Sequence, residues 1–224
     1  MKYTTENGRS MVEMLGVLAI IGVLSVGGIA GYSKAMNKFK INKTTDQVSM
    51  LIANLRTMFS SQGNYAGLDN AQAVNFGIVP DDMYDTCSTG ENATCNITNP
   101  FGGDVVIKSS PLRAADETDT ITTGKDLKGA FYIEYNGLSK EACITLATGD
   151  WGSGQSSGLI GMAVNGAKNG AGTTANNLLV SSTDGADGAS AIPGGKQYPT
   201  PMSVASAVKG CTSANANSVA WKYY

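Results

Sequence analysis

The chain has 224 residues, a formal net charge of −2 and no histidine. This balance gives no general electrostatic footprint for nucleic acid, which excludes a strongly basic DNA-binding protein. A Ser-His-Asp triad requires histidine, and without histidine or a Cys-x-x-Cys pair a zinc site lacks its usual ligand spacing. The composition therefore favours a protein that is not an enzyme and holds no cofactor or metal, and nucleic acid is not indicated as a partner.

The amino terminus is the most informative part of the chain. Gly8 is followed by four residues, then by Glu13 and by the uncharged run Met14 to Ser33. About 20 apolar residues are enough to cross a bilayer as a helix. A carboxylate held in hydrocarbon costs on the order of 3 kcal/mol, so Glu13 is a candidate functional residue that needs a partner, and a new amino terminus could be that partner.

This combination of Gly8, Glu13 and the apolar run resembles the prepilin signal of type IV pilins and related pseudopilins. The resemblance implies that a membrane peptidase cuts after Gly8 and methylates the new amine. It also implies that Glu13 pairs with that amine on a neighbouring subunit, and that Gly22 occupies a position where many pilins carry glycine. Arg9 departs from the Phe or Met that usually follows the cut, and it adds a second cation near Glu13.

The apolar run is also compatible with simpler roles. An ordinary secretory signal could end near Gly28-Ile29-Ala30, although the apolar run is longer than such a signal requires. A plain single-span anchor accounts for the run. Neither role accounts for Glu13. That residue could also cap the first helical turn, where a carboxylate contributes about 0.3 to 1 kcal/mol, and this role is compatible with pairing.

Lysines follow the apolar run, and their distribution conflicts with the positive-inside rule, which would keep the carboxyl-terminal side in the cytoplasm. These are Lys34, Lys38, Lys40 and Lys43, whereas Lys2 and Arg9 precede the run. Long domains translocate largely regardless of charge. We therefore interpret the lysines as a solvated helix face just outside the bilayer.

The helical pattern continues beyond the membrane-length run. Apolar residues recur at spacings of three and four, which places them on one helix face: Val48, Leu51, Ile52, Leu55, Met58 and Phe59. Gln62-Gly63-Asn64 then supplies a stop. A helix from Arg9 to Gln62 would be about 80 Å long, and its second half would present an apolar stripe to a head domain.

The four cysteines, Cys87, Cys95, Cys143 and Cys211, can pair in three ways. We favour Cys87 with Cys95, because their separation makes a local loop, and this leaves Cys143 with Cys211. The second pairing also resembles the disulfide-bounded carboxyl-terminal region of type IV pilins, particularly the type IVb group. The alternative, four reduced buried thiols, suits a cytosolic protein better.

The rest of the chain predicts an α+β head in which a mainly antiparallel sheet packs on the long helix. The expected strands are Asp104 to Ser109, Gly129 to Tyr135, Leu159 to Val164 and Ser218 to Tyr224. Short helices are expected from Ser139 to about Thr148 and from Pro201 to Lys209. The glycine-rich stretch between Trp151 and Pro201 predicts a loop-rich surface, and Gly170-x-Gly172-x-x-Ala175 within it is interpreted as a loop.

These features predict a leader (1–8), a transmembrane and filament-core helix (9–33), its amphipathic continuation (34–62) and a head (63–224). The expected protein is a structural subunit of a type IV pilus-like filament that serves adhesion, motility, conjugation or DNA uptake. Its partners would be further copies in a helical homopolymer, prepilin peptidase, the inner-membrane assembly machinery and, before assembly, the membrane itself. The expected location is the bacterial inner membrane and then the cell surface. The alternatives are a minor pilin, a type II secretion pseudopilin, or a membrane-anchored periplasmic binding module that never polymerises. A secreted enzyme is disfavoured by the missing histidine, although carboxylate chemistry would need none.

Overall fold

The computed structural model describes residues 11–88, 94–111, 128–152, 157–168, 170–176, 189–192, 196–199 and 201–224. Two compact units divide the chain, Met1–Lys40 and Ile41–Tyr224. Helix α1, Met11–Phe59, supplies the described part of the first unit and the beginning of the second. The second unit is the head.

Helix α1 forms where the sequence predicts it but ends at Phe59, three residues before the expected stop. The backbone N–H of Gln62 donates to the carbonyl oxygen of Phe59, so a turn replaces the last predicted helical residues. Gly63 follows with a φ of 67°, a left-handed conformation that glycine adopts without strain. The helix therefore ends before the predicted stop, and Gly63 belongs to the turn region that follows it.

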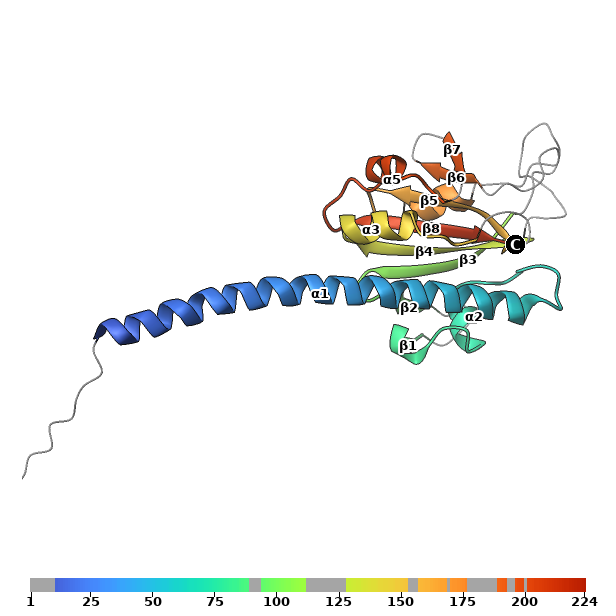
Figure 1. Cartoon of the computed structure of the whole chain (residues 1–224). Helices are drawn as coiled ribbons and strands as arrows, with labels where there is room; N and C mark the ends of the chain where they lie inside the picture. Colours follow the sequence, from blue (N-terminus) through green and yellow to red (C-terminus); the bar gives the residue numbers. More distant parts are fainter. Residues whose placement is uncertain are drawn as a thin grey trace, which may run out of the picture. The chain divides into compact units, whose positions relative to one another are not determined.

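The head is built on one mixed sheet whose strand order is β1-β2-β3-β4-β8-β5-β6-β7 (Figure 1). The strands are β1 Tyr84–Cys87, β2 Cys95–Thr98, β3 Asp104–Ser110, β4 Ala130–Leu138, β5 Leu159–Asn165, β6 Ala189–Ile192, β7 Lys196–Pro199 and β8 Asn217–Tyr223. Neighbouring strands pair antiparallel, except that β6 is parallel to β5. The last strand lies between β4 and β5, so the carboxyl terminus is in the middle of the sheet. The predicted α+β class is confirmed.

Short helices complete the head. They are α2 Asn70–Asn75, the 3-10 helix η1 Asp81–Met83, α3 Lys140–Ala147, α4 Ala171–Asn176 and α5 Val204–Gly210. Ser139 caps α3 by accepting from the N–H of Ala142, and Ser203 caps α5 by accepting from the N–H of Ser206. Serine is a favoured cap because its oxygen satisfies an unpaired N–H of the first turn. Helices α3 and α5 were predicted, and both are confirmed.

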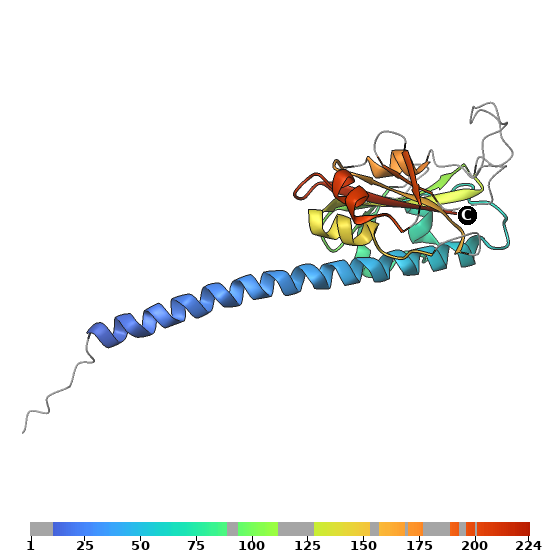
Figure 2. The same ribbon diagram turned by 45° about the horizontal axis from the view of Figure 1, so that its top comes forward.

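The two faces of the sheet have different covers. Along β4, Phe131, Ile133 and Tyr135 enter the main hydrophobic core, which the carboxyl-terminal part of α1 shares. The alternate residue Tyr132 belongs to a smaller cluster on the other face, where α4 contributes Ala171. Successive side chains of a strand point to opposite faces, so one strand serves both clusters. Figure 2 shows α1 running beneath the sheet in the head.

The stripe on the second half of α1 is buried as predicted, with one exception. Val48, Leu51 and Leu55 are fully buried in the main core, and Phe59 is 4% exposed. Met58 is 44% exposed, so its assignment to the buried face was wrong. A stripe along a helix covers a limited arc, and Met58 lies at its edge.

Candidate assembly site

The first unit exposes its apolar residues instead of burying them. An 18-residue stretch of α1 has a mean hydropathy of 2.2, and none of this stretch is buried. By length and composition alone this helix can cross a membrane. A signal sequence near an amino terminus can have the same length and composition. Val23 is 75% exposed and Leu24 is 69% exposed. A helix that is apolar all round requires a cover, either lipid or other helices.

Glu13 lies in the first turn of α1, and its side chain is exposed. A carboxylate there interacts favourably with the helix dipole. Within the described part of the chain Glu13 makes no ion pair. The predicted processing residues, Gly8 and Arg9, lie outside the described residues.

Gly22 has open space around it. A Cβ built on Gly22 meets no atom within 4 Å, and the same is true at Gly27 and Gly31. Packing inside the described chain therefore does not require glycine at these positions. Any steric need for a small residue must come from outside the subunit.

The structure contains both disulfides that the sequence favoured. Cys87 and Cys95 face each other across β1 and β2 with their Cα atoms 4.4 Å apart. Cys143 on α3 is bonded to Cys211, directly after α5, with a Cα distance of 5.9 Å and no exposure of either residue. The first bond closes a local hairpin, whereas the second joins two helices that are far apart in sequence.

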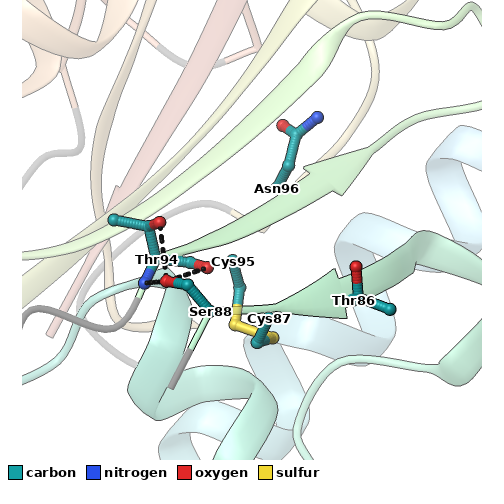
Figure 3. Close-up of a pocket in the computed structure, with 6 residues that line it drawn as sticks. All are labelled: Thr86, Cys87, Ser88, Thr94, Cys95 and Asn96. Atoms are coloured by element: carbon teal, nitrogen blue, oxygen red, sulfur yellow. Dashed lines mark hydrogen bonds between the residues drawn. A yellow bond between two sulfur atoms is a disulfide. The ribbon is translucent and has the colours of Figure 1, made fainter. Parts of the chain in front are cut away.

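A shallow pocket lies beside the hairpin disulfide (Figure 3). The oxygen of the Ser88 side chain accepts from the N–H of Thr94 at 2.8 Å and lies 3.0 Å from the hydroxyl of Thr94. Thr86 and Asn96 complete the polar part of its lining. None of its described lining residues is charged, and among the described residues no cluster of His, Cys, Asp or Glu could hold a metal ion. These hydrogen bonds join the two ends of the hairpin, and the described lining residues suggest neither catalysis nor metal binding.

Two charged side chains are buried under α4, a feature that the sequence did not indicate. Glu134 is 3% exposed, and its Oε1 accepts from the N–H of Gly172 at 2.8 Å. Lys222 is fully buried, and its Nζ donates to the carbonyl oxygen of Asn176 at 3.0 Å. The acid thus binds the amino-terminal end of α4 and the base its carboxyl-terminal end, as the helix polarity favours. These residues hold α4 on the sheet.

Burial shifts the pKa of both groups. It raises the pKa of Glu134, and hydrogen bonds from the backbone N–H groups of Gly172 and Ala171 partly oppose that rise. It lowers the pKa of Lys222 from 10.5 to about 7. In both cases the low-dielectric surroundings disfavour the charged form. Perturbed pKa values often mark functional sites, but here both groups hold the backbone of their own chain.

Gly172 shows why α4 was interpreted as a loop. A Cβ at this position would clash with Oε2 of Glu134, so the helix approaches the sheet closely enough to require glycine. In a sequence, glycine indicates loops more often than helices. The loop interpretation of Gly170 to Ala175 was wrong, because tertiary packing overrides the weak helix propensity of glycine.

Comparison with known proteins places the chain in a family. The family model described as Bundlin matches residues 33–223. This match covers far more than half of the chain. The chain belongs to the bundlin family. The resemblance to type IV pilins of the IVb group is thereby confirmed, and the protein is a pilin and not an enzyme.

Two relatives of this bundlin-family pilin have named functions. The major structural subunit of the bundle-forming pilus from Escherichia coli O127:H6 is 27% identical over 143 residues, which are 64% of each chain. The toxin coregulated pilin of Vibrio cholerae serotype O1 is 27% identical over 151 residues, which are 66% of this chain and 59% of that protein. The matched region therefore spans less than two thirds of each relative.

Solved pilin structures also align with this chain. The type IV b pilin from Salmonella typhi gives a TM-score of 0.44 at 18% identity, over 78% of this chain and 93% of that one. A type IV pilin from Vibrio cholerae El Tor biotype gives 0.47 at 20% identity, over 83% and 99% respectively. The family match begins at residue 33, so Gly8, Arg9, Glu13 and Gly22 precede it.

Proposed function

We propose that this bundlin-family pilin is the structural subunit of a type IV pilus-like surface filament, and that it polymerises through its amino-terminal helix. The observation that carries the proposal is the exposed, largely apolar first half of α1, joined in one chain to a folded pilin head. Outside a membrane these side chains would face water unless other helices covered them. A bundle of such helices from successive subunits supplies that cover.

The expected interface is heterologous. One patch of a subunit contacts a different patch of the next, and such contacts produce an open helical filament when the rotation does not close into a ring. The two relatives from Escherichia coli and Vibrio cholerae are named as a pilus subunit and a pilin. The first is named as a major structural subunit, which favours a major over a minor pilin.

Glu13 and Gly22 are proposed as assembly residues. After cleavage following Gly8, the amine of Arg9 would begin the mature chain close to Glu13 in sequence. Inside a bundle of apolar helices an ionised carboxylate needs a cation, and a neighbouring amine is a suitable one. The space around Gly22 would allow a neighbouring backbone to approach, as small residues do in membrane helix pairs.

We also propose the route to the filament. The leader (1–8) is removed by prepilin peptidase while 9–33 spans the inner membrane, the amphipathic segment 34–62 supports the head (63–224), and the assembly machinery then moves the subunit into the filament. The filament would serve adhesion, motility, conjugation or DNA uptake.

Two measurements on native cells test this function. Mass spectrometry of the mature protein is expected to show a chain that begins at Arg9, and shearing of the cells is expected to release filaments composed mainly of this chain. A mature chain that begins near Gly31 would instead identify an ordinary secreted protein. Correct cleavage without filaments would favour the membrane-anchored module, and trace amounts in a filament of another subunit would identify a minor pilin.

A further inference from the structure

The far end of the membrane-length run has the features of a membrane interface. Met14 to Ser33 contains 20 residues, which extend about 30 Å as a helix and match the hydrocarbon core of a bilayer. Tyr32, at the end of this run, is 66% exposed. Tyrosine is enriched where membrane meets water, because its ring is apolar and its hydroxyl is polar. Lys34 follows directly.

Two exposed lysines lie immediately beyond this boundary. Lys34 and Lys38 are four residues apart on α1 and therefore share a face. They make no ion pair within the described part of the chain, whereas Lys43 binds Asp82 at 2.6 Å. The sequence has no acidic residue between Glu13 and Asp46. The positive charge at this boundary is therefore not offset along the helix.

We propose that Lys34 and Lys38 form an interfacial anchor that binds the headgroups of anionic phospholipids on the outer face of the inner membrane. The inference rests on the membrane stage of the proposed function. Each lysine close to an anionic membrane surface raises the binding constant for that surface about fivefold. The long side chains reach the headgroups while their stems stay against the apolar helix. Tyr32 lies at the depth where its hydroxyl meets the same layer.

The position of the lysines favours lipid over an acidic protein partner. They continue directly from an exposed apolar surface that has the length of a bilayer, so headgroups are the first polar groups that they meet before assembly. The anchor also gives a reason for lysines on the translocated side, where the positive-inside rule does not expect them. They fix the depth of the span until the subunit leaves for the filament.

The test uses the full chain in bilayers of phosphatidylcholine with a minority of phosphatidylglycerol. Spin-labelled forms of both lipids show which one is immobilised at the protein perimeter. We expect several-fold enrichment of phosphatidylglycerol around the wild type and loss of most of it in Lys34→Gln/Lys38→Gln. Raising NaCl to about 1 M, where the Debye length is about 3 Å, should also reduce the enrichment.

The matched control is Lys140→Gln/Lys209→Gln, which removes two exposed lysines from the head and gives the same net charge. It should keep the enrichment. Equal immobilisation of the two lipids around the wild type would overturn the anchor, and so would enrichment that survives Lys34→Gln/Lys38→Gln. Lysines that instead pair with acids of a second copy would give equal immobilisation and a loss of sheared filaments in that variant. No immobilised lipid around any chain would contradict the membrane stage itself.

Discussion

The two halves of α1 show how one continuous helix can serve two different environments. In the first half Leu24 is 69% exposed, while in the second half Leu51 and Leu55 are fully buried in the head. The difference lies in arrangement. The first half is apolar all round, whereas the second half has a stripe at helical spacing and polar residues elsewhere. A stripe can be satisfied within one subunit, but an all-round apolar surface requires lipid or other subunits.

The two halves of α1 also differ in their glycine content. The first half contains Gly16, Gly22, Gly27, Gly28 and Gly31, and residues 32–62 contain none. Each glycine weakens a helix by about 0.5 to 1 kcal/mol relative to alanine. The first half is therefore the weaker helix on its own, and it gains most from neighbours that cover it. The second half contains no glycine and has a head to pack against.

The largest effect is expected from Glu13→Gln, which tests whether the exposed half is covered by other subunits. Glutamine preserves the size and hydrogen bonding of the side chain but cannot neutralise a neighbour's amine. Breaking a buried pair costs about 3 to 5 kcal/mol. We expect filament assembly to be blocked or slowed, with cleavage, membrane insertion and head folding nearly intact. Sheared filaments, quantified as mature subunit, measure the effect.

The matched control is Glu141→Gln, which removes an acid from the first turn of another helix, α3. Its filament yield should stay near that of the wild type. Arg9→Phe separates the two cations that Glu13 could bind, because only the amine then remains. Normal assembly in Arg9→Phe would assign the pairing to the amine. A normal yield from Glu13→Gln would rule out the pairing.

The next largest effect concerns the head that covers the second half of α1. The loop-entropy model gives about 4.4 kcal/mol for the Cys143–Cys211 closure and about 2.5 kcal/mol for Cys87–Cys95. We therefore expect Cys143→Ala/Cys211→Ala to sensitise the head to proteolysis more than Cys87→Ala/Cys95→Ala does. Time courses of limited digestion under the same conditions provide the measurement. Equal sensitivity of the two variants would contradict this ranking.

The same substitution in both halves of α1 compares them directly. Leu51→Ala removes a fully buried side chain and should destabilise the head by about 3 kcal/mol. Leu24→Ala removes a side chain that is 69% exposed, so the free energy of unfolding of the head should not change. Denaturant unfolding in detergent, followed by the fluorescence of Trp151 and Trp221, measures both. Equal losses would mean that Leu24 also contacts the head.

Local patterns were sufficient for much of this fold. The stripe on α1, the helix that begins after Ser139, and the strands rich in β-branched and aromatic residues all have signals within a few neighbouring residues. The central strands β3, β4, β5 and β8 were therefore predicted close to their observed bounds. Strand order was not predicted, because nothing local indicates that β8 lies between β4 and β5.

Three of the elements that were missed, β1, β2 and α4, depend on distant partners. Strands β1 and β2 are only four residues long and are held by the Cys87–Cys95 bond and by pairing with β3. Helix α4 depends on Glu134 and Lys222, which are in strands far from it in sequence. In a sequence these two residues look like ordinary surface charges, since buried acids and lysines are rare. No periodicity could have indicated them.

The smallest effect is expected from a buried titratable side chain. The head contains such a residue, Lys222, whereas the described residues in the exposed half of α1 include none. Burial lowers the pKa of Lys222 to about 7. Between this value and 10.5, the unfolded chain holds a proton that the folded chain has lost. The wild type should therefore gain up to about 1.4 kcal/mol of stability for each pH unit above 7.

Lys222→Met lacks this proton and should not show that gain, so the difference in unfolding free energy should move in favour of the wild type between about pH 7 and about pH 9. The unfolding free energy of the variant relative to the wild type should be highest at about pH 6, because its methionine side chain buries no charge in place of the lysine. The variant also loses the hydrogen bond to the carbonyl oxygen of Asn176. Denaturant unfolding at several pH values provides the measurement. Lys140→Met removes an exposed lysine instead and should run parallel to the wild type. A pH-independent gap between Lys222→Met and the wild type would show that Lys222 stays charged in the folded head throughout this range.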